Sequence, residues 1–441
     1  MTEFGLEVTG VKHPAVLVAG LLGLAVFVPY VARVVFPDSS FHPASFAIIA
    51  IGLVVVLARR AASLDELKTH WYVYAGGLLV AAVALTMTLL NRGDYGKAYV
   101  VNHMVVPLTL FAVVQVVLHQ RDRSVRTLGQ LVVIMGCIQT LIGGLQLATQ
   151  SPLIFASRYG DYSWLDTMIA EGRVMGTMDH PLVLALFLLI CVPLTFSFRS
   201  VYLRAGTVAV LLGGILLTQS RLAAVAGLAM VVILVFQYVS SRRVRLTIVS
   251  ALLLALGLVA LSPLGQSLIG RFQNDQGSNT RRFVALDLYG SVWTKHILSG
   301  EGLGTSYALT GGAQLKSSLE NPVLMMAVDI GLVWALIWVA LQLWLASGLG
   351  SRQTSTTRLD GSRAVPRSGA WRSTLNLQFA AVAALLFTQS FSSTATESAS
   401  SVLVWFALAL FTVQRRNAGL AALEAGVEHG RARHRAVGSA Q

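Results

Sequence analysis

The segment that decides the fold is residues 14–36, PAVLVAGLLGLAVFVPYVARVVF, whose only charged residue, Arg33, lies near its far end. An apolar run of about 20 residues is long enough to cross the hydrocarbon core of a membrane as a helix. This run is too long for the core of a signal peptide, and no small-residue cleavage site follows it. We therefore expect a retained transmembrane helix here.

Similar apolar segments recur along the chain. Of its 441 residues, 55% are hydrophobic and only 12% are charged, a charged share well below that of a typical soluble domain. The pattern predicts an all-α, polytopic integral membrane protein with about 12 transmembrane helices. They are expected near residues 14–36, 43–58, 71–90, 98–118, 127–148, 181–198, 205–219, 222–239, 246–262, 322–346, 375–391 and 398–414.

The connections between these predicted spans alternate in charge. Those on one side, together with both terminal segments, hold 22 of the 33 Lys and Arg residues, and those on the other side hold 10. Cytoplasmic loops of membrane proteins are enriched in Lys and Arg. The alternation therefore predicts that both termini are cytoplasmic, in a bacterial inner membrane. It also accounts for the net charge of +13 without a nucleic-acid partner.

Residues 1–414 are expected to form a single transmembrane domain. Two of its external loops are long, at 149–180 and at 263–321, and the second is expected to be partly helical. Loops of this length are usually functional or disordered. The cytoplasmic segment 347–374 is predicted to be a flexible basic linker, and the basic tail 415–441 is predicted to be disordered.

The sequence contains no P-loop, no dinucleotide-binding fingerprint, no HExxH zinc motif and no GxSxG nucleophile motif. The segment GEGLG at 300–304 follows a helix-like stretch rather than a strand, which argues against a dinucleotide site. Cys137 and Cys191 fall inside predicted spans, where they are expected to be small buried hydrophobic residues. Neither has neighbours at metal-ligand spacing. We expect neither a metal nor a cofactor.

Arginines on the predicted external side are the distinctive feature, because the positive-inside rule disfavours them there. Any one of them could simply reach lipid phosphates. Arg221, however, lies in a tight turn between two apolar helices, which directs its guanidinium at one place. Guanidinium binds phosphate in a bidentate manner, so converging arginines could hold a pyrophosphate. The others are Arg173, Arg281 and Arg282.

The order of five short motifs resembles the O-antigen ligase and O-antigen polymerase family. The motifs are GRVMGTMDHP at 172–181, TQSR at 218–221, TRRF at 280–283, HILSGEGLG at 296–304 and SLENPVLMMAVDIGL at 318–332. Members of this family are membrane-embedded inverting glycosyltransferases that use polyprenyl-linked sugar donors. The resemblance extends from about Gly172 to Trp334.

The resemblance implies roles for individual residues. Arg221 and Arg282 would grip the donor pyrophosphate, and Glu320 occupies the position where the family ligases carry a catalytic histidine. An acidic residue followed by asparagine is more similar to some exopolysaccharide polymerases than to the ligases. Alternatively, Glu320 only stabilises the N-terminus of the following helix through the helix dipole. In that case the base is expected among four acidic residues of the other long loop. The substrate-binding candidates are Arg281, Arg173, Asn321 and His180, and the alternative bases are Asp161, Asp166, Glu171 and Asp179.

Three polar residues near the spans have simpler interpretations. Asp329, inside the tenth predicted span, is expected to be a buried partner of an arginine or a backbone group. His103 and His180 are expected to be interfacial hydrogen-bonding residues, with acceptor binding as the alternative.

The expected activity is therefore transfer of a glycan from a polyprenyl-pyrophosphate donor to a saccharide or lipid acceptor, on the external face. Membrane lipids and other polysaccharide-assembly proteins are the further partners expected. Two other classes stay open. A secondary transporter or lipid-linked-glycan flippase fits the span count, and a non-catalytic assembly partner would tolerate the loss of Arg221.

Overall fold

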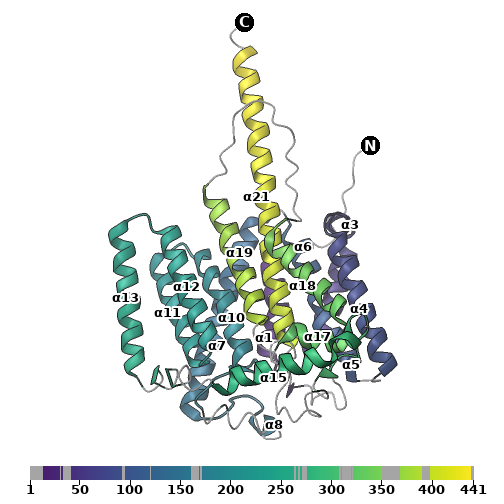
Figure 1. Cartoon of the computed structure of the whole chain (residues 1–441). Coiled ribbons are helices and arrows are strands. Elements are labelled where there is room, and N and C mark those ends of the chain that lie inside the picture. The colour runs from purple at the N-terminus through teal and green to yellow at the C-terminus, as the bar shows by residue number, and fades with distance from the viewer. Residues whose placement is uncertain are drawn as a thin grey trace.

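The computed structural model describes residues 13–29, 31–32, 41–91, 95–119, 121–159, 168, 171–262, 265–266, 269–270, 276–306, 309, 319, 321–349, 368–389 and 398–438. The regular elements among these residues are all helices, which confirms the predicted all-α class for the described chain (Figure 1). They are α1 (Pro14–Phe27), α2 (Pro43–Ala58), α3 (Arg60–Thr69), α4 (Trp71–Asn91), α5 (Tyr95–Val100), the π-helix η2 (Val101–Val105), α6 (Val106–Leu118), α7 (Asp122–Thr149), α8 (Ala156–Tyr159), α10 (Pro181–Leu194), the 3-10 helix η3 (Thr195–Ser197), α11 (Val201–Leu217), α12 (Arg221–Tyr238), α13 (Arg242–Leu261), α15 (Gln276–Val292), the 3-10 helix η4 (Trp293–His296), α17 (Pro322–Ile330), α18 (Leu332–Ser347), α19 (Ser368–Thr388) and α21 (Ser398–Gly438).

Four described helices are long and apolar enough to cross a membrane. They are Trp71–Asn91, Gly96–Leu118, Asp122–Thr149 and Arg221–Tyr238. A fifth is added if Pro43–Ala58 and Arg60–Thr69, which meet at an angle of 102°, count as one broken span. Five further apolar helices have 10–17 residues each. By length and composition the chain therefore has the helices of a polytopic membrane protein.

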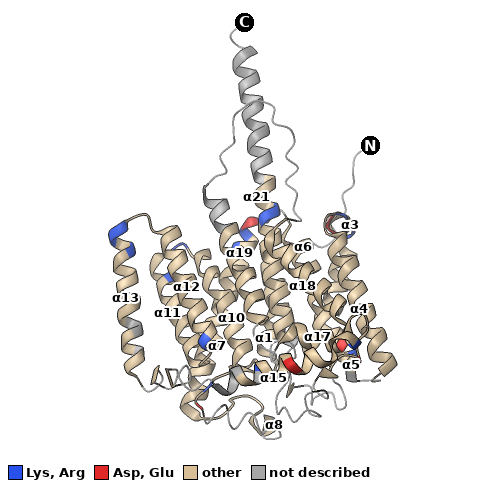
Figure 2. Ribbon diagram, in the orientation of Figure 1, with Lys and Arg blue, Asp and Glu red and all other residues tan. Residues whose placement is uncertain are grey.

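The long helices lie side by side, and α15 lies across one end of the bundle, here called the α15 end (Figure 1). The short helix α3 lies at the opposite end, the α3 end, from which α21 projects. Many of the described Lys and Arg residues lie at the α3 end, for example where α13 begins (Figure 2). Since α13 begins there, the preceding helix α12 begins at the α15 end, and Arg221 is its first residue.

The centre of the bundle is built from helices that are apolar on every side. All 14 residues of α10 are buried, and so are most residues of α6. A helix that is hydrophobic all round is stable only when other helices surround it. The peripheral α13 in contrast exposes apolar residues such as Leu253, Leu254 and Leu258. An exposed apolar surface of this kind suits contact with lipid.

Several predicted boundaries were wrong. The first span was expected to reach residue 36, but α1 ends at Phe27 because Val28 turns to extended backbone and Pro29 follows. The tenth span is interrupted at Gly331 between α17 and α18. Part of the predicted loop 59–70 is the helix α3. The tail that was expected to be disordered from residue 415 continues α21 as a helix to Gly438.

The interruption at Gly331 allows another segment to approach its backbone. Gly331 has a φ of +102°, and a Cβ there would lie 2.8 Å from the carbonyl carbon of Leu298. At Gly300 a Cβ would lie 2.2 Å from the carbonyl carbon of Asp329. The backbone N–H groups of Glu301 and Gly302 donate to the carbonyls of Val328 (3.0 Å) and Asp329 (2.9 Å). The GEGLG segment is therefore fixed against the broken helix, and glycine is required for this contact.

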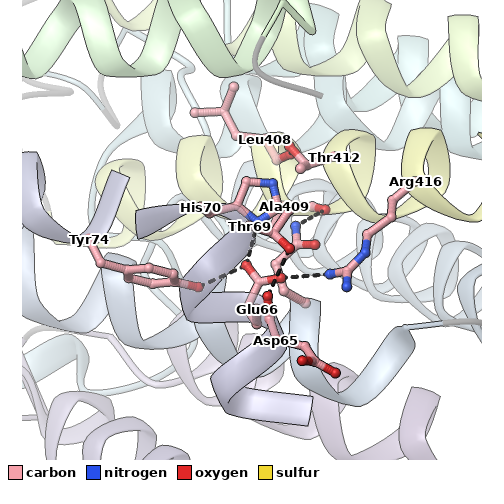
Figure 3. A network of polar contacts seen from close by, with 10 residues as sticks. Asp65, Glu66, Thr69, His70, Tyr74, Leu408, Ala409, Thr412 and Arg416 are labelled. Atoms are coloured by element: carbon pink, nitrogen blue, oxygen red, sulfur yellow. Dashed lines mark hydrogen bonds and ion pairs between the residues drawn. The ribbon is translucent and has the colours of Figure 1, made fainter. Parts of the chain in front are cut away.

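A buried carboxylate joins three helices at the α3 end (Figure 3). The Glu66 side chain is only 3% exposed and pairs with Arg416 of α21 at 2.9 Å. It also lies 2.7 Å from Nδ1 of His70 and accepts a hydrogen bond from the Tyr74 hydroxyl at 3.0 Å. A buried charge is tolerated when it is paired and hydrogen-bonded in this way. The cluster holds α21 against α3 and α4 where it leaves the bundle.

Candidate functional site

The turn between α11 and α12 presents Arg221 at the α15 end. Gln219 adopts a left-handed conformation with φ of 53°. Ser220 is the N-cap of α12, and its hydroxyl accepts a hydrogen bond from the backbone N–H of Ala223 at 3.4 Å. Arg221 therefore occupies the first helical position, where the helix dipole favours a negative charge and disfavours a positive one. An anion bound here would interact favourably with both the guanidinium and the helix N-terminus.

The segment 171–174 packs directly on this turn. The backbone N–H of Val174 donates to the carbonyl of Leu217 at 3.2 Å. Arg173 donates from Nε to the carbonyl of Thr218 at 3.3 Å, and the Gln219 amide donates to the carbonyl of Glu171 at 3.0 Å. The structure thus brings Arg173 and the Arg221 turn together, although the sequence separates the two motifs.

Two glutamines of α7 hold this segment in place. Gln146 donates to the carbonyl of Gly176 at 2.6 Å and accepts from its backbone N–H at 2.9 Å. Gln139 accepts from the backbone N–H of Thr177 at 3.0 Å and donates to its hydroxyl at 2.6 Å. Both glutamines are buried. No sequence motif pointed to them, although two amides seven residues apart inside an apolar span lie on one helix face.

His180 has a structural role. Its Nδ1 accepts a hydrogen bond from the backbone N–H of Leu182 at 3.1 Å, so the side chain caps α10. Burial, and then the positive charge of Arg173, lower the pKa of His180 to about 3. The imidazole is therefore neutral near pH 7. It can position the end of α10 and cannot contribute a positive charge to a bound pyrophosphate.

The remaining sequence candidates lie on or near α15 and α17. Arg282 is half-buried on α15, which packs through Ala285 and Tyr289 on residues of α17. Asn321 caps α17, because its side-chain oxygen accepts from the backbone N–H groups of Val323 (2.9 Å) and Leu324 (3.2 Å). Glu320 and the side chain of Arg281 lie outside the described residues. The convergence of Arg221 with Arg282 stays a prediction.

A small, mainly apolar pocket with several polar groups opens beside these elements. Its cavity volume is about 80 Å³, and it lies between α5–η2, α17, α18 and the adjoining ends of α19 and α21. His103 stacks on Tyr99 at a centroid distance of 5.4 Å, and its Nδ1 lies 3.1 Å from the Ser401 hydroxyl. The Gln389 side-chain oxygen is buried there without a hydrogen-bond partner. Polar groups around an aromatic ring suit a hydroxylated ligand.

The pocket is adjacent to the position of Glu320 in the chain. Pro322, two residues further along the sequence, lines it. The η2 segment that carries His103 is a π-helix, an element frequent at functional sites. Among the sequence candidates, the structure therefore places His103 in a pocket and His180 in a cap.

Asp329 anchors one wall of this pocket. Its carboxylate accepts hydrogen bonds from the backbone N–H groups of Ser306 at 2.8 Å and Gly304 at 3.1 Å, and from the Thr305 hydroxyl at 3.3 Å. The expectation that Asp329 is a buried partner of backbone groups is confirmed. Because these donors satisfy it, Asp329 holds the GEGLG loop against the break between α17 and α18.

No protein-family model and no curated protein matches this chain. Among the described residues, no group of three or more His, Cys, Asp and Glu side chains is arranged to hold a metal ion.

Proposed function

We propose that the chain crosses a bacterial inner membrane 12 times, with the α3 end cytoplasmic and the α15 end external. Each of the twelve predicted ranges contains a described helix or pair of helices, which supports this topology. The distribution of charge supports it too, since many of the described Lys and Arg residues lie at the α3 end, for example where α13 begins (Figure 2). Helices of 14–17 residues would reach across with the help of their polar ends.

Cysteine labelling tests this topology. In a variant with Cys137 and Cys191 replaced by serine, a cysteine is introduced at Asp287 of α15 or at Ser241 before α13, both of which are exposed. In intact cells a membrane-impermeant maleimide is expected to label position 287 and not 241. After the cells are broken open, both positions are expected to react. Labelling of 241 alone in intact cells would contradict the proposed orientation and place the arginines in the cytoplasm.

We propose that the protein is an inverting glycosyltransferase acting on a polyprenyl-pyrophosphate-linked glycan. The observation that carries this proposal is the placement of Arg221 at the first position of α12, on a turn that accepts a hydrogen bond from Arg173. The chain that follows Arg173 is in turn bonded to buried Gln146 of α7. Guanidinium groups and a helix N-terminus are the groups that bind a pyrophosphate in proteins. The resemblance to the O-antigen ligase family supports the same assignment.

The reaction requires removal of a proton from the acceptor hydroxyl and stabilisation of the negative charge on the departing pyrophosphate. The acceptor hydroxyl oxygen forms a bond to the anomeric carbon while the bond from that carbon to the pyrophosphate oxygen breaks. The hydroxyl proton passes to a base, for which Glu320 is the candidate, and polyprenyl pyrophosphate leaves as an anion. Arginines stabilise the developing charge on the leaving group most when they are fixed in place beforehand. The pocket beside Pro322 is the proposed location of the acceptor.

A transporter or flippase is the competing proposal. Such proteins use ionisable groups inside the membrane to couple movement to ions or protons. The carboxylate of Asp329 is instead bonded to three donors of one loop, which favours a fixed structural role. This bonding supports the enzyme over the transporter.

Deletion of the gene in its host separates the two proposals. For the enzyme, a polyprenyl-linked glycan is expected to accumulate in the outer leaflet of the inner membrane, where an added glycosidase can reach it in spheroplasts. For a flippase the same lipid would accumulate in the inner leaflet and be protected. The absence of any accumulated lipid-linked glycan would contradict both. Complementation with the intact gene controls for effects on neighbouring genes.

A further inference from the structure

An apolar groove lies at the α3 end, far from the proposed catalytic residues. Its volume is about 570 Å³, and it lies between α2, α3, α4 and α6. The chain bends by 102° between α2 and α3, so α3 turns away from the bundle and forms one wall. Most of the lining is apolar, from residues that include Val56, Leu57, Leu64, Leu67, Ala112 and Val116.

The surface around the groove is unusually apolar for a segment next to water. Leu57, Leu64 and Leu67 are 57%, 56% and 48% exposed. Trp71, which begins α4, is 63% exposed. The short helix α3, which carries Leu64 and Leu67, also exposes Asp65 and Lys68. A helix with exposed leucines and charged residues, followed by tryptophan, is typical of a segment in the interface between lipid tails and headgroups.

Two arginines stand where the helices bend. Arg60 lines the groove and Arg59 precedes it. The side chains of both donate no hydrogen bond to the described part of the chain. Burial, and then the positive charge of Arg121, lower the pKa of Arg59. A bound anion favours the charged form of such a guanidinium.

The carboxylate of Glu66, the one acidic residue among the described residues that line the groove, already has bonding partners. It is bonded to Arg416, His70 and Tyr74 (Figure 3). The other carboxylates on the neighbouring helices, Asp65 and Asp122, are exposed. Arg60, which lines the apolar groove, and Arg59 before it thus have no buried acidic partner among the described residues.

We propose that this groove is a binding site for one anionic phospholipid of the cytoplasmic leaflet. An acyl chain lies along the apolar wall formed by α2, α3 and α6, and the phosphate is held by Arg59 and Arg60. The fit is chemical: guanidinium binds phosphate oxygens in a fork, while the apolar lining takes a hydrocarbon chain. This site is independent of the proposed glycosyltransferase activity, and only its assignment to the cytoplasmic leaflet rests on the proposed topology.

Native mass spectrometry of the purified full-length protein tests the site. The probes are phosphatidylglycerol and phosphatidylcholine with identical acyl chains, added in detergent at matched concentrations. The unmodified protein is expected to retain one phosphatidylglycerol in preference to phosphatidylcholine. The double variant Arg59→Ala and Arg60→Ala is expected to bind phosphatidylglycerol about tenfold more weakly or worse. Inorganic phosphate at the same concentration is expected not to displace the lipid, because it lacks the chain.

Two further variants separate a built site from general attraction. Ala112→Phe fills the groove without changing charge and is expected to reduce binding of both lipids. The control Arg242→Ala with Arg243→Ala removes two exposed arginines at the start of α13, at the same end of the bundle, and is expected to leave binding unchanged. Each variant is first shown to elute as the unmodified protein does in size-exclusion chromatography. Equal retention of the two lipids by the unmodified protein, or an equal loss in the α13 control, would overturn the proposal.

Discussion

Arg221→Ala is expected to lower the rate of glycan transfer about 10²- to 10³-fold, while the protein still folds. The first residue of α12 can face a bound pyrophosphate from a fixed turn, so its guanidinium needs little rearrangement as negative charge develops on the leaving group. One hydrogen bond to a charged group is worth about 1.5–3 kcal/mol, and a bidentate contact supplies two. The measurement is transfer from a polyprenyl-pyrophosphate-linked glycan by protein in nanodiscs.

Arg221→Lys distinguishes the two components of this effect. Lysine keeps the charge but lacks the planar fork, so we expect partial activity, between that of Arg221→Ala and that of the unmodified protein. Arg243→Ala is the matched control, because this arginine is exposed at the opposite end of the bundle. Full transfer activity of Arg221→Ala would refute a role in donor binding. Equal losses in Arg221→Ala and Arg243→Ala would indicate a general effect on the membrane protein.

Arg173 is expected to behave differently from Arg221. Its Nε donates to the carbonyl of Thr218, so Arg173→Ala also removes a contact that holds the turn. A loss of activity in that variant would therefore combine binding with positioning. For this reason Arg221 is the more informative of the two positions.

The helical class could be predicted because the sequence contains long apolar runs. A single segment of chain in lipid can satisfy its own backbone hydrogen bonds only as a helix. The breaks did not follow, because they depend on contacts between distant segments. The α17–α18 interruption exists because residues 298–302 approach Gly331 and Asp329 with backbone atoms. Nothing within residues 322–346 alone predicts that approach.

The candidate site was predicted in part. The sequence identified Arg173 and Arg221 from their unfavourable sidedness, and the structure places their segments in contact. It did not identify Gln139 and Gln146, which look like isolated polar residues until the loop they bind is known. His180 was expected to be a hydrogen-bonding residue, and its hydrogen bond to the backbone N–H of Leu182 agrees with that, although the sequence analysis did not specify an N-cap.

Glu320→Gln is expected to lower transfer roughly 10²- to 10⁴-fold, the usual contribution of a general base. Glutamine retains the shape and the hydrogen-bonding capacity of glutamate, and it cannot accept the hydroxyl proton. Two observations motivate this prediction, one from the sequence and one from the structure. Glu320 immediately precedes the cap residue Asn321, and Pro322 lines the pocket proposed for the acceptor. The assay is the same nanodisc transfer reaction, with folded yield measured for each variant.

Two further variants distinguish a role of Glu320 as the base from a structural effect at the start of α17. Glu320→His is expected to recover part of the activity, since imidazole accepts a proton and the resembling ligases carry histidine at this position. Asn321→Ala removes the cap of α17 and should lower stability by about 1 kcal/mol, with a smaller effect on transfer than Glu320→Gln.

Near-normal transfer by Glu320→Gln would show that another group takes the proton. Of the four acidic residues proposed as alternatives, Asp161 and Asp166 lie outside the described residues. Asp179 would be a weaker successor than Glu171, because its carboxylate already accepts a hydrogen bond from the Tyr159 hydroxyl at 2.6 Å, whereas Glu171 is exposed. His103 is a further candidate, because its imidazole lines the pocket proposed for the acceptor and its Nδ1 lies 3.1 Å from the Ser401 hydroxyl.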